Sequence, residues 1–215
     1  MDRHLEPEWL DHLPAVDPAA VRSRADLRRI NFLMGNERWI LRSLARFPAA
    51  MARGLHEWGS GDGGLLLRVA KRHPRAHLTA FDLAPRPRFD DATDGHIDWR
   101  QGDLFAAPPG KGGVLVANLF LHHFDVEALR KLGRRCAGYQ VLLFNEPDRA
   151  RLPLALGGLM HPFVNHVTRH DMRVSILAGF RHGEIQRLLG LAAHQWRFEE
   201  TSTWRGARRV IAWRA

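Results

Sequence analysis

The chain has 215 residues, 45% of them apolar and 26% charged, which is enough for one well-buried α/β domain and short for two. Lys and Arg outnumber Asp and Glu by 32 to 23, but the excess is scattered without interleaved aromatic side chains, which disfavours nucleic acid as the partner. The single cysteine, Cys136, excludes an intrachain disulfide and a C-x-x-C metal site, and since neither a secretion signal nor a membrane span is evident, we expect a cytoplasmic protein.

Residues 1–50 are expected to form an N-terminal arm and a helical lid, and residues 51–215 the main domain. Three prolines lie in the first 18 residues, which favours a loosely attached arm or a short helix. Apolar residues then recur at helical spacing over residues 21–52, and Gly35-Asn36 indicates a break between two helices.

Strands and helices alternate through the middle of the chain. Strands are predicted at about 53–58, 77–82, 96–103, 112–119 and 139–146, with helices over 65–73 and 126–138. This alternation is typical of a doubly wound parallel sheet of the Rossmann-like kind. Residues 194–215 predict a terminal antiparallel hairpin, which gives seven strands, and the apolar, His-rich stretch at about 147–190 is expected to be a pocket insertion.

A glycine loop joins the first strand to the helix that follows it, in the stretch HEWGSGDGG of residues 56–64. The stretch fits two templates, because Gly59, Gly61 and Gly64 spell G-x-G-x-x-G, while Glu57, Gly59, Gly61 and Gly63 spell E-x-G-x-G-x-G. Such a loop lets the backbone approach a ligand and leaves helix-terminal N–H groups to meet it. A tight turn without a ligand explains the glycines as well.

Acidic residues at the strand ends sharpen this choice. Asp82, at the end of the second strand, can accept both hydroxyls of a ribose, and Asp103, after the third, can accept an adenine amine. Glu57 would repel a dinucleotide pyrophosphate but attract the ammonium of a methionine moiety. The carboxylate therefore favours S-adenosylmethionine (SAM) as the cofactor.

With the glycine loop, the segments TAFDLAP (79–85), QGDLF (101–105) and ANLFLHHF (117–124) resemble the ordered motifs of class I SAM-dependent methyltransferases. More narrowly, LRRINFLMGNERWI (27–40) and NHVTRHDMRVSILAGF (165–180) resemble small bacterial methyltransferases associated with type III polyketide or phenolic-lipid pathways. One departure is Trp58, which is bulky for its place in the loop motif and is expected to point into the helix layer.

The resemblance implies a role for each motif residue. Glu57 would face the methionine ammonium, Asp82 and the adjoining Leu83 the ribose, and Asp103 and Leu104 the adenine. The remaining residues implied to bind the cofactor are those of the loop, Gly59, Ser60, Gly61 and Gly63, and Asn118 and Leu119 beside the sulfonium.

The acceptor is narrowed mainly by exclusion. The fourth strand ends without [DN]-P-P-[YFW], which argues against methylation of a nucleic-acid base amine. His122 and His123 follow that strand directly, and either is a candidate general base for a phenolic proton, although the pair can equally be structural. A small, aromatic or hydrophobic acceptor methylated at oxygen is the resulting hypothesis.

The insertion supplies another candidate base, His170, in the run Arg169-His170-Asp171 that is expected to line the acceptor pocket. His166 and His170 also have metal-ligand spacing, but the glutamate of an H-E-x-x-H helix is missing, so no metal is predicted.

Two alternatives stay open, besides monomer against homodimer. The net charge of +9 supports an RNA-directed or non-catalytic SAM-binding protein. An NAD-dependent oxidoreductase is disfavoured, because Tyr139, the only tyrosine, has no lysine four residues later.

Overall fold

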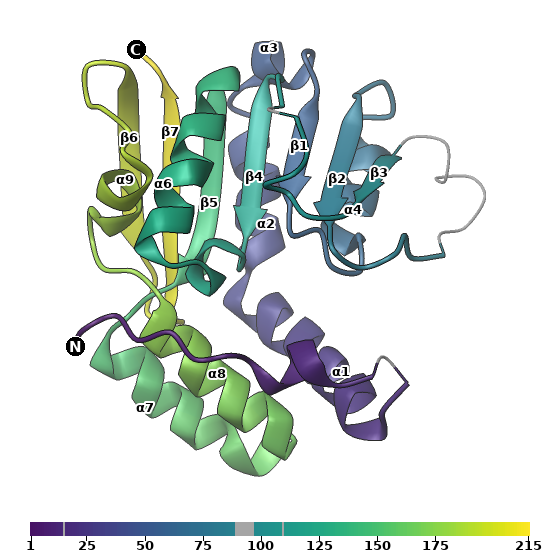
Figure 1. The fold of residues 1–215 in the computed structure, drawn as a ribbon, viewed down its shortest axis with the longest axis vertical. Coiled ribbons are helices and arrows are strands. Elements are labelled where there is room, and N and C mark those ends of the chain that lie inside the picture. The colour runs from purple at the N-terminus through teal and green to yellow at the C-terminus, as the bar shows by residue number, and fades with distance from the viewer. Residues whose placement is uncertain (15, 89–96, 109) are drawn as a thin grey trace.

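A computed structural model describes residues 1–14, 16–88, 97–108 and 110–215. These residues form one sheet of order β3-β2-β1-β4-β5-β7-β6 (Figure 1). The five parallel strands predicted from the sequence are present, although His96, the first residue of the expected third strand, lies outside the described residues. Their bounds are β1 Leu55–Trp58, β2 Leu78–Asp82, β3 Ile97–Gln101, β4 Val114–Asn118 and β5 Val141–Pro147.

The predicted terminal hairpin is also confirmed. It consists of β6 (Trp196–Ser202) and β7 (Ala207–Arg214), and β7 lies antiparallel between β5 and β6. The chain therefore has the Rossmann-like, seven-stranded mixed sheet that the sequence predicts.

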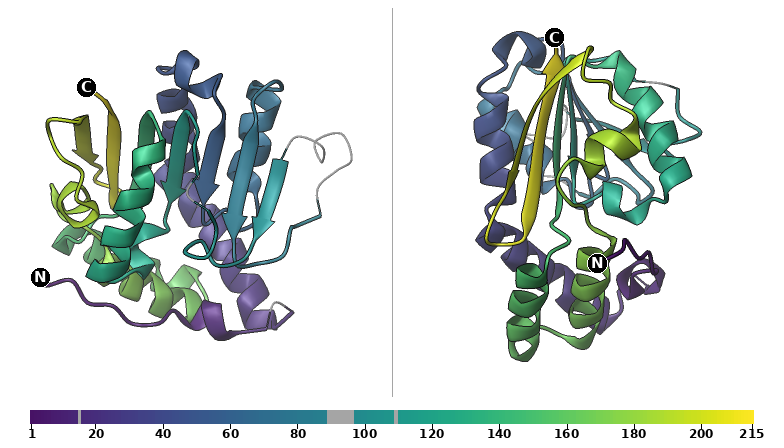
Figure 2. Two further views of the ribbon diagram at one scale, coloured as in Figure 1. Left: turned by 45° about the horizontal axis from the view of Figure 1, so that its top comes forward. Right: turned by 90° about the vertical axis from the view of Figure 1, so that its left-hand side faces the viewer.

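Both faces of the sheet are buried, because successive side chains of a strand point to opposite faces. On one face Leu115 and Phe144 pack with residues of α6 (Val126–Arg135) and α9 (Glu184–Leu189). On the other face Val116 and Leu143 pack with residues of α2 (Asn36–Leu44) and α4 (Gly64–Arg72). Figure 2 shows these two helical layers edge-on.

The N-terminal third is helical where it was predicted to be. It contains η1 (Trp9–His12), α1 (Pro18–Met34) and α3 (Pro48–Met51) besides α2. The Asp17 side chain caps α1 by accepting from the N–H groups of Ala19 and Ala20, and Pro18 starts the helix. Gly35, in the left-handed region at φ 69°, separates α1 from α2, which is the expected break.

The insertion after β5 forms α7 (Arg151–Met160), η4 (His161–Phe163) and α8 (His166–Ala178). With α1, these helices lie beyond the carboxyl ends of the parallel strands, and the N-terminal segment crosses α8 (Figure 1). Polar contacts join α1 to the start of α8: Asn165 N–H donates to Asp26 at 3.0 Å, and the Thr168 hydroxyl to the Ser23 hydroxyl at 3.0 Å. The insertion and α1 thus form one helical layer over that edge.

Within the described residues, no helix has both the length and the apolar character that crossing a membrane requires.

Candidate functional site

The glycine loop leaves β1 and enters α4 through three residues in the left-handed region. Gly59, Gly61 and Gly63 have φ of 70°, 55° and 72°. At Gly59 the reason is also steric, because a Cβ there would lie 2.2 Å from the ring of Phe120. The loop is therefore folded back tightly over the end of β4, and Ser60 within it is buried.

Trp58 does not widen this loop. Its side chain is buried in the core between the sheet and α6, where it meets the ring of Tyr139 edge-on at 6.4 Å. It points into the helix layer, as predicted.

Asp82 ties the loop to the end of β2. Its carboxylate accepts from Gly61 N–H at 2.6 Å and from Ala84 N–H at 2.8 Å. Because a carboxylate has about four lone-pair positions, it retains capacity for further hydroxyl donors. The adjoining Leu83 is exposed and so lies on the surface at this edge.

Glu57 is the most unusual group of the site. Its side chain is 2% exposed, yet its Oε2 has no hydrogen-bond partner among the described residues. Burial raises the pKa of this carboxyl well above its usual value, although the nearby Ser60 hydroxyl acts in the opposite direction. A buried, unpartnered acceptor at the start of a glycine loop matches a ligand with a cationic donor.

The third strand ends next to Asp82. Gly102 N–H donates to Asp82 carbonyl oxygen at 2.8 Å, so Asp103 lies at the neighbouring strand end. The Asp103 carboxylate is exposed and accepts from Phe105 N–H at 2.8 Å, while the side chain of Leu104 is buried. The structure thus brings Asp82 and Asp103 to one edge of the sheet.

The end of β4 is held by β5. Leu119 has a φ of 55°, which is uncommon for a residue with a side chain, and its N–H donates to the Asn145 carbonyl at 2.8 Å. The Asn145 amide also donates to Asn118 Oδ1 at 2.8 Å. Asn118 and Leu119 are therefore fixed beside the glycine loop.

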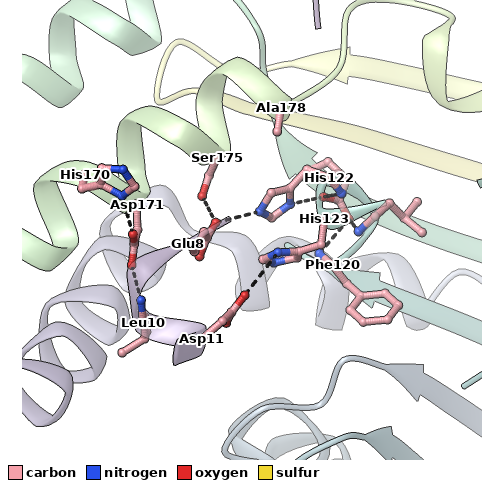
Figure 3. Close-up of polar contacts among 12 residues, drawn as sticks. Glu8, Leu10, Asp11, Phe120, His122, His123, His170, Asp171, Ser175 and Ala178 are labelled. Carbon is pink, nitrogen blue, oxygen red and sulfur yellow. Dashed lines mark hydrogen bonds and ion pairs between the residues drawn. The ribbon is translucent and has the colours of Figure 1, made fainter. Parts of the chain in front are cut away.

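His122 lies in the short helix η2 (Leu121–His123) and is held by Glu146 at the end of β5. The Glu146 carboxylate accepts from the N–H groups of Phe120 and Leu121 at 3.0 and 2.8 Å, and lies 2.8 Å from His122 Nδ1. His122 Nε2 lies 3.5 Å from Glu8 of the N-terminal segment (Figure 3). Burial lowers the pKa of His122, but the two carboxylates outweigh it and raise the pKa to about 9.

His123 is in a different state. Its Nδ1 faces Asp11 at 4.0 Å (Figure 3). Burial and the neighbouring charged His122 lower the pKa of His123 to about 4, so its ring is neutral at pH 7.

His170 is not in contact with the histidine pair. Its ring stacks on Trp9, with centroids 3.9 Å apart, and its Nδ1 lies 2.9 Å from Asp171. Asp171 in turn accepts from the N–H groups of Trp9 and Leu10 at 2.8 and 3.0 Å. His170 therefore contacts the N-terminal segment, and the structure separates it from His122 and His123.

One group of side chains has the composition of a metal site. Glu8, His122 and His123 place donor atoms within 4.8 Å of one another. Both ring nitrogens of His122 already face carboxylates, so ion pairing accounts for this cluster.

The opposite pKa shifts of the two histidines predict a stability maximum near pH 6.5. The stabilisation from His122 is fully present below its unfolded pKa of about 6.5 and is lost as pH rises through about 9, a change of roughly 3 kcal/mol. The lowered pKa of His123 acts in the opposite sense, because stability is lost as pH falls from about 6.5 towards 4. Urea unfolding of wild type and Glu146→Gln between pH 6 and 9.5 tests this, and an equal alkaline loss in the variant would contradict it.

Sequence reasoning missed four polar residues of the site: Glu8, Asp11, Asn145 and Glu146. A signal existed for the last two, because NE follows the buried run VLLF at a strand end, where binding groups of such sheets gather. No local pattern connects Glu8 or Asp11 to His122 and His123, more than 110 residues away.

Comparison with known proteins places this geometry. No protein-family model matches the sequence. Cephaeline 6'-O-methyltransferase of Carapichea ipecacuanha is 31% identical over 84 residues, which are 39% of this chain and only 23% of that enzyme.

Solved structures match over nearly the whole chain. The plantazolicin methyltransferase BpumL in complex with S-adenosylhomocysteine (SAH) has a TM-score of 0.68 at 10% identity, over 93% of this chain and 91% of its own. Human N-acetylserotonin methyltransferase in complex with SAM has a TM-score of 0.57 at 20% identity, over 95% of this chain and 61% of its own. The pyocyanin biosynthetic protein PhzM has a TM-score of 0.57 at 16% identity, over 96% and 61%. The chain thus spans about three fifths of the last two proteins, and its fold is that of SAM-dependent methyltransferases.

Proposed function

We propose that the protein is an enzyme that transfers the methyl group of SAM to an oxygen of a small, aromatic or hydrophobic acceptor. The observation that carries this proposal is the buried carboxylate of Glu57, whose Oε2 has no partner among the described residues. A methionine ammonium satisfies this acceptor, whereas a pyrophosphate would place like charges together.

The other loop and strand-end residues fit the rest of the cofactor. In this proposal Asp82 and Leu83 contact the ribose, Asp103 and Leu104 the adenine, and Asn118 and Leu119 flank the sulfonium. The residues of the loop itself, Gly59, Ser60, Gly61 and Gly63, line the methionine and ribose. The cofactor supplies an activated methyl group, so the protein has chiefly to position the acceptor and to remove its proton.

His122 is the base that the geometry supports best. Glu146 lies 2.8 Å from its Nδ1, which orients the ring and stabilises the imidazolium that forms when Nε2 takes a hydroxyl proton. His123 is then a neutral neighbour that shapes the pocket. Because His170 stacks on Trp9, we assign it to the cover over the pocket in place of its predicted role as a base.

Calorimetric titration with SAM, SAH and NAD(H) tests the cofactor. We expect micromolar binding of SAM and SAH, and a loss of roughly 1–3 kcal/mol of binding free energy in Asp82→Ala, because ribose hydroxyls lose their acceptor. Asp98→Ala is the matched control, because Asp98 pairs with Arg100 on the surface of β3 at 2.9 Å. Binding of NAD(H), or of none of the three, would overturn the proposal.

The acceptor class is the finer part of the proposal. The similarity of residues 27–40 and 165–180 to methyltransferases of polyketide and phenolic-lipid pathways, and the partial match to a cephaeline O-methyltransferase, support phenols as the first acceptors to test. Transfer of labelled methyl to a phenol panel measures this. Label recovered on amines alone would exclude O-methylation.

A second function, an RNA-directed or non-catalytic SAM-binding protein, is favoured by the net charge of +9. Salt-dependent affinity for RNA together with no methyl transfer to phenols would support it. The division at about residue 50 into cover and main domain, cytoplasmic location and the choice between monomer and homodimer remain proposals.

A further inference from the structure

The N-terminal segment, defined here as residues 3–11, is fastened across the end of β4 and along α8. At one end Arg3 donates to the carbonyls of Ala178 and His122 at 2.7 and 3.0 Å, and its guanidinium lies 4.8 Å from the ring centroid of Phe180. His4 N–H donates to the Leu177 carbonyl at 3.2 Å.

The other end of the segment is held by Asp171. Both of its carboxylate oxygens accept backbone N–H groups, from Trp9 and from Leu10, and the Trp9 ring stacks on His170 (Figure 3). Asp171 is 1% exposed, so these two bonds are shielded from water and hold η1 against α8.

Between the two anchors, Glu8 points at the candidate base. Its side chain is 12% exposed, and its Oε1 lies 3.5 Å from His122 Nε2 and accepts from the Ser175 hydroxyl. Since Glu146 faces Nδ1, the imidazole of His122 lies between two carboxylates (Figure 3). A ring that donates to both has no lone pair with which to take a proton from an acceptor.

We propose that the N-terminal segment is a latch: Glu8 holds His122 in a form that cannot act as a base, and the acceptor's reacting hydroxyl takes the place of the Glu8 carboxylate at Nε2. This inference rests on the proposed function.

The chemistry balances once the latch opens. When Glu8 leaves, the Nε2 proton passes to water and Nε2 regains its lone pair. The acceptor's hydroxyl proton then moves to Nε2 while its oxygen bonds the methyl carbon, and the C–S bond of the sulfonium breaks with its electron pair left on sulfur. The imidazolium afterwards returns its proton to water.

Several charged groups face His122 besides Glu8, and a titration must separate them. They are Glu146 from β5, His123 from η2, Arg3 and Asp11 from the N-terminal segment, and Asp171 from α8. Removing the charge of Glu8 alone leaves all of these in place.

The test uses the full chain with 15N-labelled histidine, without cofactor or acceptor. In wild type the His122 imidazolium is expected to persist to about pH 9, and in Glu8→Gln the midpoint should fall by about one pH unit or more, because one of two close carboxylates is neutralised. Glu6→Gln is the matched control, since Glu6 belongs to the same segment and pairs with His4 on the surface at 2.7 Å. An unchanged midpoint in Glu8→Gln overturns the latch.

Amide exchange gives a second, independent readout. In Glu8→Ala the Trp9 and Leu10 amides should exchange at least about ten times faster than in wild type, because an anchor of the segment is lost, and Glu6→Ala should leave them protected. Equal protection in Glu8→Ala overturns the proposal. So does micromolar Zn²⁺ that shifts both His122 and His123 in wild type but not in Glu8→Gln, since the cluster would then be a metal site. SAM calorimetry on the same samples keeps failure of the latch distinct from failure of the proposed function.

Discussion

Replacing Glu57 by glutamine is expected to weaken SAM binding and to stabilise the protein at the same time. The carboxylate is buried with an unpartnered Oε2, so its charge is compensated only by a cationic ligand. We expect roughly a hundredfold loss in SAM affinity, about the value of one charge-assisted hydrogen bond. Calorimetry measures the affinity, and urea unfolding without ligand measures the stability.

The sign of the stability change follows from the raised pKa of Glu57. A carboxyl whose pKa is higher in the folded chain stabilises the fold below its unfolded pKa and loses that contribution as pH rises through the folded pKa. Glutamine removes this loss, so the variant should be the more stable protein at neutral pH. SAM affinity of the wild type should also rise with pH, because the ammonium requires the charged carboxylate.

Glu37→Gln is the control for this prediction. Glu37 also lies near the glycine loop, but it is paired with Arg68 at 2.8 Å. Its replacement should leave SAM affinity unchanged and give no stabilisation. A Glu57→Gln variant that binds SAM as tightly as wild type would remove the observation on which the proposed function depends.

The cofactor half of the site was predictable because its signals are local. Gly59, Glu57 and Asp82 each lie at the end of a strand whose apolar pattern is evident from the sequence, and parallel strands bring their carboxyl ends to one edge. The orientation of Trp58 followed likewise, since alternation along β1 points its side chain into the layer that covers the sheet.

The acceptor half was less predictable because its contacts join distant segments. His166 and His170 have a suggestive helical spacing, but what determines the environment of His170 is Trp9, from the opposite end of the chain. In the same way, adjacent His122 and His123 appear equivalent in the sequence, and only Glu8 and Glu146 make their charge states differ.

Replacing Arg208 by methionine is expected to destabilise the protein by about 3–5 kcal/mol, because it leaves buried carboxylates without their cation. Arg208 Nη2 lies 2.7 Å from Asp148 and its Nη1 3.0 Å from Glu200, and all three side chains are less than 10% exposed. Urea unfolding measures the loss. Arg46→Met is the matched control, because Arg46 pairs with Glu199 of the same hairpin in solvent and should contribute less than about 1 kcal/mol.

The size of this effect depends on the charges left behind, so it should be partly reversible. Adding Asp148→Asn and Glu200→Gln to Arg208→Met should recover part of the lost stability, whereas a network that acted only through packing would lose more with each change. Arg208 Nε also donates to the Phe180 carbonyl at 3.1 Å, just after α8, and Phe180 is the ring over which Arg3 lies. The same buried cation therefore fixes the hairpin to the sheet and positions the end of α8, to which the N-terminal segment and its Glu8 latch are fastened.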